Sequence, residues 1–235
     1  MTNASLEGSR TAEGPASADK GGSPTTHFRF GLAAILHLTG RVADRVVSAY
    51  DGLLAIDQKE AAKIYLDMGT NLAHKGNSDN AVAALRKTLE LEPDNGDAWF
   101  CLGMVHSDRQ EPEDAVLAFK KAMALGKDGP KLHYRLAEAF VDAGDYQAAA
   151  KELQRSVELD PLSAESFFRL GVALDNLQRY EEAVAAFEKA IDLSPREAAY
   201  YQSLGFTMES LKRHEDAVTC FKRAVELERR QQPMR

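Results

Sequence analysis

The feature that most constrains this chain is a pattern of apolar and small residues that returns every 34 residues. Five copies begin at residues 62, 96, 130, 164 and 198, with no insertion between them. In the fourth copy the core of the pattern is FFRLGVALDNLQRYEEAVAAFEKAIDLSP, from Phe167 to Pro195. Both halves of this stretch place apolar residues three and four positions apart, which is the spacing of one helix face. Each copy therefore predicts a hairpin of two helices.

Small residues stand at two fixed places in every copy and predict how closely the two helices approach. The eighth position is glycine in four copies and alanine in one, and the twentieth is always alanine. An aromatic residue or leucine at the twenty-fourth position fills the space between the helices. A single hairpin cannot bury its apolar face alone, so successive hairpins are expected to stack. The small eighth-position residues are Gly69, Gly103, Ala137, Gly171 and Gly205.

The period, the small residues and the closing prolines Pro93, Pro161 and Pro195 resemble the tetratricopeptide repeat. This resemblance implies an all-α fold, an α-solenoid of five tetratricopeptide hairpins preceded by a degenerate helical hairpin. The predicted repeats are residues 62–95, 96–129, 130–163, 164–197 and 198–231. The link around residues 125–130 has two glycines and lacks the closing proline, which predicts either a bend in the array or a simple loop variant.

The residues before the repeats divide into two parts. Residues 1–26 are rich in Ser, Gly, Ala, Thr and Pro, so we expect a disordered polar tail or a docking peptide. Residues 27–61 are expected to form an N-terminal helical segment or degenerate repeat, with Ala34 and Tyr50 at the eighth and twenty-fourth positions. This segment can cap the array, serve as a self-assembly helix, or lie on a membrane surface through Phe28–Leu38. The predicted self-assembly residues are Val42, Val46, Tyr50 and Leu53.

Composition and motifs argue against several classes of function. The net charge of −7 is unlike that of a nucleic-acid-binding protein, and no run of 18 apolar residues predicts a membrane span. Cys101 and Cys220 are expected to be reduced fillers, and His106 and His133 fall at core positions and are interpreted as structural. The six histidines show no ligand spacing, and no catalytic motif is present. We therefore expect no catalytic residues, no metal site and no cofactor.

A second face of each first helix, opposite the packed one, predicts a binding surface. It comprises the second, fifth, ninth, twelfth and thirteenth positions of each repeat, and in tetratricopeptide arrays it lines the binding groove. An apolar row outside the core is typical of a binding site, and acids beside it favour an amphipathic peptide with Lys or Arg next to apolar anchors. The alternative is that Phe100 and Phe168 simply pack between repeats. The predicted groove residues are Leu66, Phe100, Met104, Asp108, Tyr134, Glu138, Asp142, Phe168, Val172, Asp175, Phe206 and Glu209.

A closer resemblance lies in the last two repeats, FFRLGVALDNLQRYEEAVAAFEKAIDLSPREAAYYQSLGFTMESLKRHEDAVTCFKRAVELE. With the preceding amphipathic segment RVADRVVSAYD, they resemble the magnetosome-associated tetratricopeptide proteins of magnetotactic bacteria. The resemblance covers roughly Arg41 to Glu228. It implies a non-enzymatic cytoplasmic scaffold that forms homo-oligomers, coats magnetosome vesicles peripherally without inserting in the membrane, and recruits other proteins, among them magnetosome membrane proteins.

These features lead to one assembly hypothesis and to alternatives from other classes. The helix Arg41–Leu54 of one molecule is expected to dock in the groove from Phe100 to Phe206 of another, and such a heterologous contact builds open assemblies. The main alternative is a monomeric adaptor that binds a basic amphipathic peptide of a client protein. Others are the repeat half of an enzyme and a membrane-peripheral protein anchored by Phe28–Leu38.

Overall fold

The computed structural model describes residues 57–231, and within this range the chain is folded into ten helices without a strand. The helices are α3 (Gln58–His74), α4 (Ser78–Leu91), α5 (Gly96–Asp108), α6 (Pro112–Ala124), α7 (Pro130–Asp142), α8 (Tyr146–Leu159), α9 (Ala164–Asn176), α10 (Tyr180–Leu193), α11 (Ala198–Ser210) and α12 (His214–Gln231).

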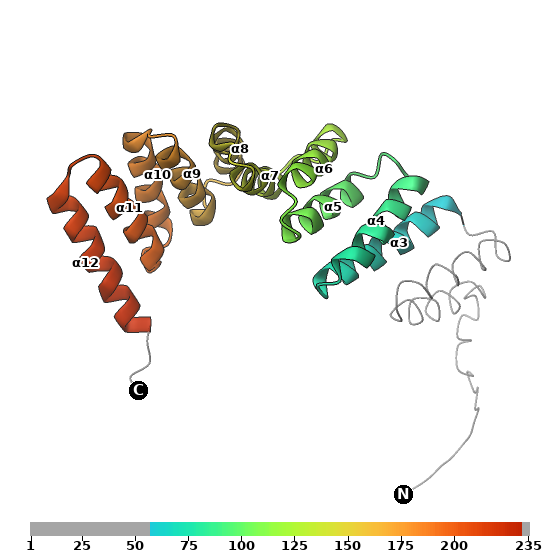
Figure 1. The fold of residues 1–235 in the computed structure, drawn as a ribbon, viewed down its shortest axis with the longest axis horizontal. Coiled ribbons are helices and arrows are strands. Elements are labelled where there is room, and N and C mark those ends of the chain that lie inside the picture. The colour runs from blue at the N-terminus through green and yellow to red at the C-terminus, as the bar shows by residue number, and fades with distance from the viewer. Residues whose placement is uncertain (1–56, 232–235) are drawn as a thin grey trace, which may run out of the picture. The chain divides into compact units, whose positions relative to one another are not determined.

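The helices pair along the chain as α3–α4, α5–α6, α7–α8, α9–α10 and α11–α12, and the second helix of each pair packs on the first helix of the next (Figure 1). The predicted all-α solenoid of five helical hairpins is therefore confirmed. The degenerate hairpin expected before it lies outside the described residues, as do the polar tail and Val42, Val46, Tyr50 and Leu53.

The close approach within each hairpin depends on the small eighth-position residue. A Cβ atom added to Gly171 would lie 2.6 Å from ring carbons of Phe187, and one added to Gly103 would lie 2.6 Å from the ring of Phe119. Both rings are almost completely buried. A larger residue at either glycine would force the two helices apart, because carbon atoms pack no closer than about 3.5 Å without repulsion.

The turn inside each hairpin has a feature that repeats at the fifteenth position. The backbone there is left-handed, with φ of 73° at Gly76 and 79° at Gly144. The same conformation is adopted by Gln110, Gln178 and Lys212, with φ between 58° and 61°. Left-handed backbone is uncommon outside glycine. The packing of the two helices thus imposes one turn geometry on all five hairpins, whatever residue stands there.

Several helix starts are fixed by side chains of the preceding turn. The side chains of Asn95, Asp145 and Ser163 accept hydrogen bonds from backbone amides three residues later, at the starts of α5, α8 and α9. Pro112 and Pro130 occupy the first turns of α6 and α7, where no backbone donor is needed. Polar residues between the repeats thus determine where each helix begins.

The core extends across neighbouring repeats and is not confined to single hairpins. Buried residues from Ala115 in α6 to Ala217 in α12 form one cluster, and Leu85, Leu102 and Val105 belong to a second cluster between the first two hairpins. His106 and His133 are only 7% and 6% exposed, in agreement with their predicted core positions. Each hairpin therefore depends on its neighbours for burial of its apolar faces.

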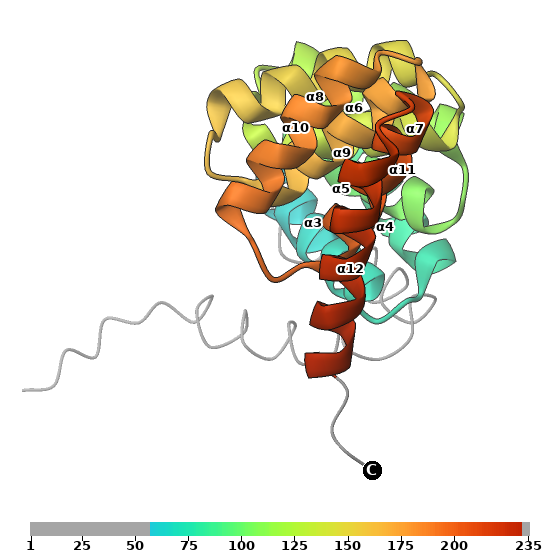
Figure 2. The same cartoon turned by 90° about the vertical axis from the view of Figure 1, so that its left-hand side faces the viewer.

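The first helices of the hairpins, α3, α5, α7, α9 and α11, are here called the first-helix layer. Within this layer α3 contacts α5, α5 contacts α7, and α9 contacts α11. Helix α12, the second helix of the fifth hairpin, ends at Gln231 and lies at the front of the view in Figure 2. The layer brings residues that are 34 positions apart in the sequence onto one surface.

The remaining structural predictions are located as follows. The link from α6 to α7 contains Gly126, whose φ is 83°, and α6 packs on α7 across this link. A bend of the array at residues 125–130 stays a prediction.

Cys101 and Cys220 are free and partly buried, and burial raises the pKa of both thiols. Among residues 57–231 no helix combines the length and the hydropathy needed to span a membrane.

Candidate protein-interaction surface

The predicted groove residues all lie in the first-helix layer, but they differ in accessibility. Phe206 is the most open of the large apolar residues among them, with 65% of its surface exposed. Asp108, Asp142 and Glu209 are exposed as well. The others are half-buried: Leu66, Phe100, Met104, Tyr134, Glu138, Phe168, Val172 and Asp175.

The four aromatic residues of the predicted row have different surroundings. Phe168 stacks on Tyr200 of the next repeat, with ring centroids 4.7 Å apart, and also contacts Phe187 in its own hairpin. Phe100 contacts the core ring of Phe119 at 5.7 Å. Phe168 therefore does pack between neighbouring repeats, and its ring is partly used for stability.

Cations cover part of the aromatic row. The ammonium groups of Lys127 and Lys131 lie 5.5 Å and 5.8 Å from the centroid of the Phe100 ring, and the guanidinium of Arg135 lies 5.8 Å from that of Tyr134. Phe206 instead meets the core through an edge-to-face contact with Phe221 at 5.1 Å and leaves most of its ring open. The accessible apolar part of the row is thus concentrated at the fifth repeat.

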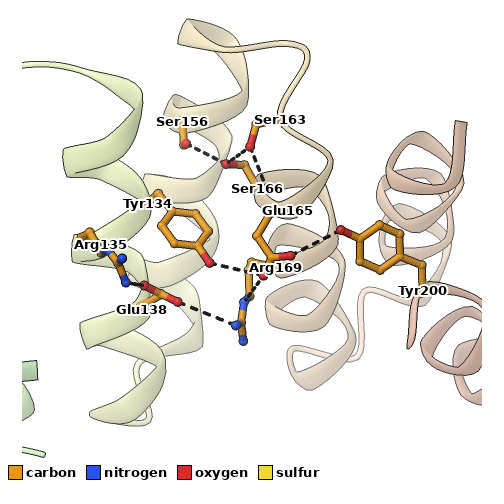
Figure 3. Close-up of polar contacts among 9 residues, drawn as sticks. All are labelled: Tyr134, Arg135, Glu138, Ser156, Ser163, Glu165, Ser166, Arg169 and Tyr200. Atoms are coloured by element: carbon orange, nitrogen blue, oxygen red, sulfur yellow. Dashed lines mark hydrogen bonds and ion pairs between the residues drawn. The ribbon is translucent and has the colours of Figure 1, made fainter. Parts of the chain in front are cut away.

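A network of polar side chains joins the third, fourth and fifth repeats, and it is centred on Glu165 of α9 (Figure 3). Tyr134 of α7 and Tyr200 of α11 donate their hydroxyls to the two oxygens of this carboxylate, each at 3.3 Å. Arg169 donates to Glu165 at 3.0 Å and lies 3.7 Å from Glu138 of α7. One carboxylate therefore connects three successive first helices.

Both tyrosines of this network ionise with difficulty. Burial is the main cause, and nearby carboxylates add to it, so that the pKa of Tyr134 and that of Tyr200 are raised to about 12. The charge of Glu138 acts most on Tyr134, and that of Glu165 acts most on Tyr200. The two hydroxyls consequently remain hydrogen-bond donors over the whole physiological pH range.

Several acids of the predicted surface already have partners. Glu138 forms an ion pair with Arg135 at 2.8 Å, and Glu209 forms one with His214 at 2.8 Å. Asp175 accepts a hydrogen bond from Thr207 at 2.7 Å. Asp108 and Asp142, by contrast, are exposed near the ends of α5 and α7. A basic ligand would meet these two carboxylates first.

The predicted groove face included Glu165, at the second position of the fourth repeat, but the list of predicted site residues omitted it together with Arg169 and Tyr200. Arg169 and Tyr200 stand at the sixth and third positions of their repeats, outside the five positions assigned to that face. What periodicity could not give is the direction of the two tyrosine hydroxyls, which meet on one carboxylate from neighbouring helices.

Two protein families match the repeat region of this chain. The family described as cytochrome c-type biogenesis protein H TPR domain matches residues 62–201, and the tetratricopeptide repeat matches residues 198–231. The chain belongs to the tetratricopeptide repeat family. This agrees with the five hairpins and the small eighth-position residues described above.

Solved structures similar to this tetratricopeptide protein include a crystal structure of MamA. It is 30% identical with a TM-score of 0.71, and the match covers 75% of this chain and 99% of that one. The crystal structure of YrrB, described as a TPR protein with an unusual peptide-binding site, is 26% identical over 74% of this chain and 89% of its own, with a TM-score of 0.69. The chain thus resembles MamA, as the last two repeats predicted.

One curated relative is the type IV pilus assembly protein PilF of Pseudomonas aeruginosa, which is 35% identical over 54 residues. The match covers 23% of this chain and spans about a fifth of PilF, 21% of its length. The fold and these relatives together support a protein-interaction scaffold.

Proposed function

We propose that this tetratricopeptide protein is a non-catalytic scaffold that assembles with itself, coats magnetosome vesicles and recruits other proteins there. Assembly occurs by insertion of the segment Arg41–Leu54 of one molecule into the first-helix layer of another. The observation that carries the proposal is the exposed ring of Phe206 in that layer. The proposal also rests on the similarity of this chain to MamA over almost the full length of a MamA structure.

The chemistry of the two partners in this contact is complementary. The inserted segment offers Val42, Val46 and Leu53 as apolar anchors, and its polar positions carry Arg41 and Arg45 together with Asp44 and Asp51. The first-helix layer offers the open ring of Phe206 and, in the second and third repeats, the exposed carboxylates of Asp108 and Asp142. The apolar contact would give affinity, and pairing of the two arginines with these carboxylates would give register.

The proposed contact is heterologous, because a segment of one molecule occupies a different surface of the next. Such contacts leave a free segment and a free surface at the two ends of any open assembly. The assembly therefore grows with concentration instead of stopping at a dimer. This property suits a protein that covers a vesicle surface.

Light scattering on the full-length protein after size-exclusion chromatography, over a tenfold range of concentration, tests the proposal. We expect an assembly whose mass grows with concentration, and a decrease of that mass in Phe206→Ala. Leu162→Ala is the matched control, since Leu162 is 78% exposed and lies between α8 and α9, outside the first-helix layer. Equal masses for Phe206→Ala and the wild type, or an unchanged mass after deletion of residues 1–56, would refute the insertion.

A second candidate function is a monomeric adaptor that binds a basic amphipathic peptide of a client protein. The exposed carboxylates of Asp108 and Asp142 favour it, because they would attract a cationic ligand in the absence of a second copy. A monomer near 25.8 kDa at all concentrations, together with salt-sensitive binding of a basic amphipathic peptide, would support the adaptor over the scaffold.

A further inference from the structure

A group of metal-ligand side chains lies at the turn between α5 and α6, next to Asp108 of the proposed interaction surface and distant in the sequence from Phe206. His106 stands in the last turn of α5, Glu111 immediately precedes α6, and Asp114 lies in the first turn of α6. One ligand atom from each of the three lies within 4.8 Å of the other two. The turn thus gathers an imidazole and two carboxylates from a stretch of nine residues, HSDRQEPED.

The spacing of two of these ligands is close to that of a coordination sphere. Nδ1 of His106 lies 2.6 Å from Oε2 of Glu111. Two neighbouring ligands, each at about 2.0–2.2 Å from a metal ion, are separated by roughly 3 Å, so a small outward movement makes room for the ion. Asp114 is exposed and can rotate toward them, since the structure gives it no ion pair or hydrogen bond within the described residues.

The buried imidazole supplies the rigid part of this group. The His106 residue is 7% exposed and its ring packs at a core position of α5, which limits its movement. Arg109 binds the other oxygen of Glu111 at 2.9 Å and holds that carboxylate in place, while Oε2 stays directed at the imidazole. Core packing and the Arg109 ion pair therefore pre-orient two of the three ligands, and a bound ion would replace the hydrogen bond between these two.

The space beside the ligands is open to solvent and to an ion. Two adjoining pockets, of about 400 Å³ and 360 Å³, share His106, Asp114 and Arg86 in their walls. The second pocket is lined by three carboxylates and two arginines beside the imidazole of His106. An entering cation would find water access on one side and protein ligands on the other.

We propose that His106, Glu111 and Asp114 form a binding site for one divalent transition-metal ion of the Zn²⁺ or Ni²⁺ class. An imidazole nitrogen with two carboxylates suits these borderline ions, whereas Ca²⁺ and Mg²⁺ prefer ligand sets made only of oxygen. Three protein ligands leave positions for water, as the open pockets allow. The bound ion would connect α5 with α6 across the turn that contains Gln110.

The other buried histidine shows why this site is specific to the second repeat. The two ring nitrogens of His133 each face a carboxylate, Glu152 at 2.7 Å and Asp128 at 2.8 Å. These acids approach from opposite edges of the ring, so they cannot share one ion. A carboxylate pair beside a histidine is therefore not sufficient, and the arrangement on one side of His106 makes the difference.

The chain offers a built-in reporter for this site. Its single tryptophan, Trp99, lines the same pocket as His106 and Asp114. Paramagnetic Ni²⁺ quenches a nearby indole, and Zn²⁺ does not, so Zn²⁺ can serve as the competitor. Titration of the untagged full-length protein with Ni²⁺ should give saturable quenching of Trp99 fluorescence that Zn²⁺ reverses and Ca²⁺ does not. Calorimetry with Zn²⁺ should give one ion per chain from the same site.

Substitutions at the exposed ligand keep the test independent of folding. Asp114→Asn removes one ligand without touching the core, and we expect the Ni²⁺ affinity to decrease by about tenfold or more, as losses around metal sites generally show. Glu113→Gln is the matched control, because Glu113 is an exposed acid in the same turn of α6 and has no place in the ligand group. The proposal is overturned if the wild type shows no saturable quenching, or if Asp114→Asn and Glu113→Gln bind Ni²⁺ with equal affinity.

Discussion

Replacement of the eighth-position glycine in the fourth repeat gives the sharpest test of how these hairpins pack. In Gly171→Ala the new Cβ atom would lie 2.6 Å from Cδ1 and Cε1 of Phe187 and 2.9 Å from Cζ. Carbon atoms in contact prefer about 3.5–4.0 Å, so the ring or the helix must move by roughly 1 Å. Overpacking of this kind costs about 1–3 kcal/mol, while alanine in a helix gains about 1 kcal/mol over glycine.

The expected net effect of Gly171→Ala is a loss of roughly 0–2 kcal/mol of unfolding free energy, and a matched control separates the two contributions. Gly96→Ala adds a Cβ atom at the start of α5, where the nearest atom, Cβ of Leu125, is 3.6 Å away. We expect this control to be neutral or stabilising. Urea denaturation followed by far-ultraviolet circular dichroism measures both variants, and Gly171→Ala should be the less stable by roughly 1–3 kcal/mol.

The third repeat of the same chain supplies the compensating change. There Ala137 occupies the glycine position and Leu153 replaces phenylalanine, and both are buried. The double variant Gly171→Ala with Phe187→Leu should therefore be more stable than the sum of the single changes predicts, by about 0.5–3 kcal/mol of coupling. A stability gain in Gly171→Ala, or additive effects in the double variant, would contradict the packing argument.

Two further predictions follow from the same structure. Leu204 is 6% exposed, so Leu204→Ala should reduce the unfolding free energy by about 2–5 kcal/mol in the same urea assay. Phe206 is 65% exposed, so Phe206→Ala should reduce it clearly less. Equal losses would show that Phe206 belongs to the core. Because the folded pKa of Tyr134 and Tyr200 is raised from 10.0 to about 12, their contribution to stability is complete below about pH 10 and is lost as the pH rises toward 12. Phenolate absorbance should accordingly show tyrosines titrating late in the folded protein, and Tyr134→Phe should remove one of them and weaken the alkaline loss of stability; an unchanged titration would be inconsistent with the burial of that hydroxyl.

The repeat spacing predicted the architecture because it reports local geometry. Apolar residues three and four positions apart specify helix faces, and Gly171 with Ala183 and Phe187 specifies how closely two faces meet. A hairpin that cannot bury its own apolar surface must stack on a neighbour, so the number and order of hairpins followed from residues 62–231 alone. The family assignment rested on the same residues and is confirmed by the matches to residues 62–201 and 198–231.

The candidate surface was less predictable, since it depends on contacts between repeats. Helical geometry placed Phe168 and Phe206 on the first-helix layer. Only the folded structure shows that Phe168 stacks on Tyr200, while Phe206 is left open. The ring of Phe168 finds an aromatic partner in the next repeat, and no periodic rule fixes the rotamers that bring the two rings together.

What the sequence determined by itself is therefore the solenoid: helix faces, close approaches and the order of hairpins all follow from spacing within one chain segment. Tertiary structure alone decided the left-handed turns at Gln110, Gln178 and Lys212, the convergence of two tyrosines on Glu165, and the gathering of His106, Glu111 and Asp114. These features depend on where side chains from different helices end in space. Periodicity fixes the direction in which a residue leaves its own helix, but the atoms that it meets there belong to another helix and are set by packing.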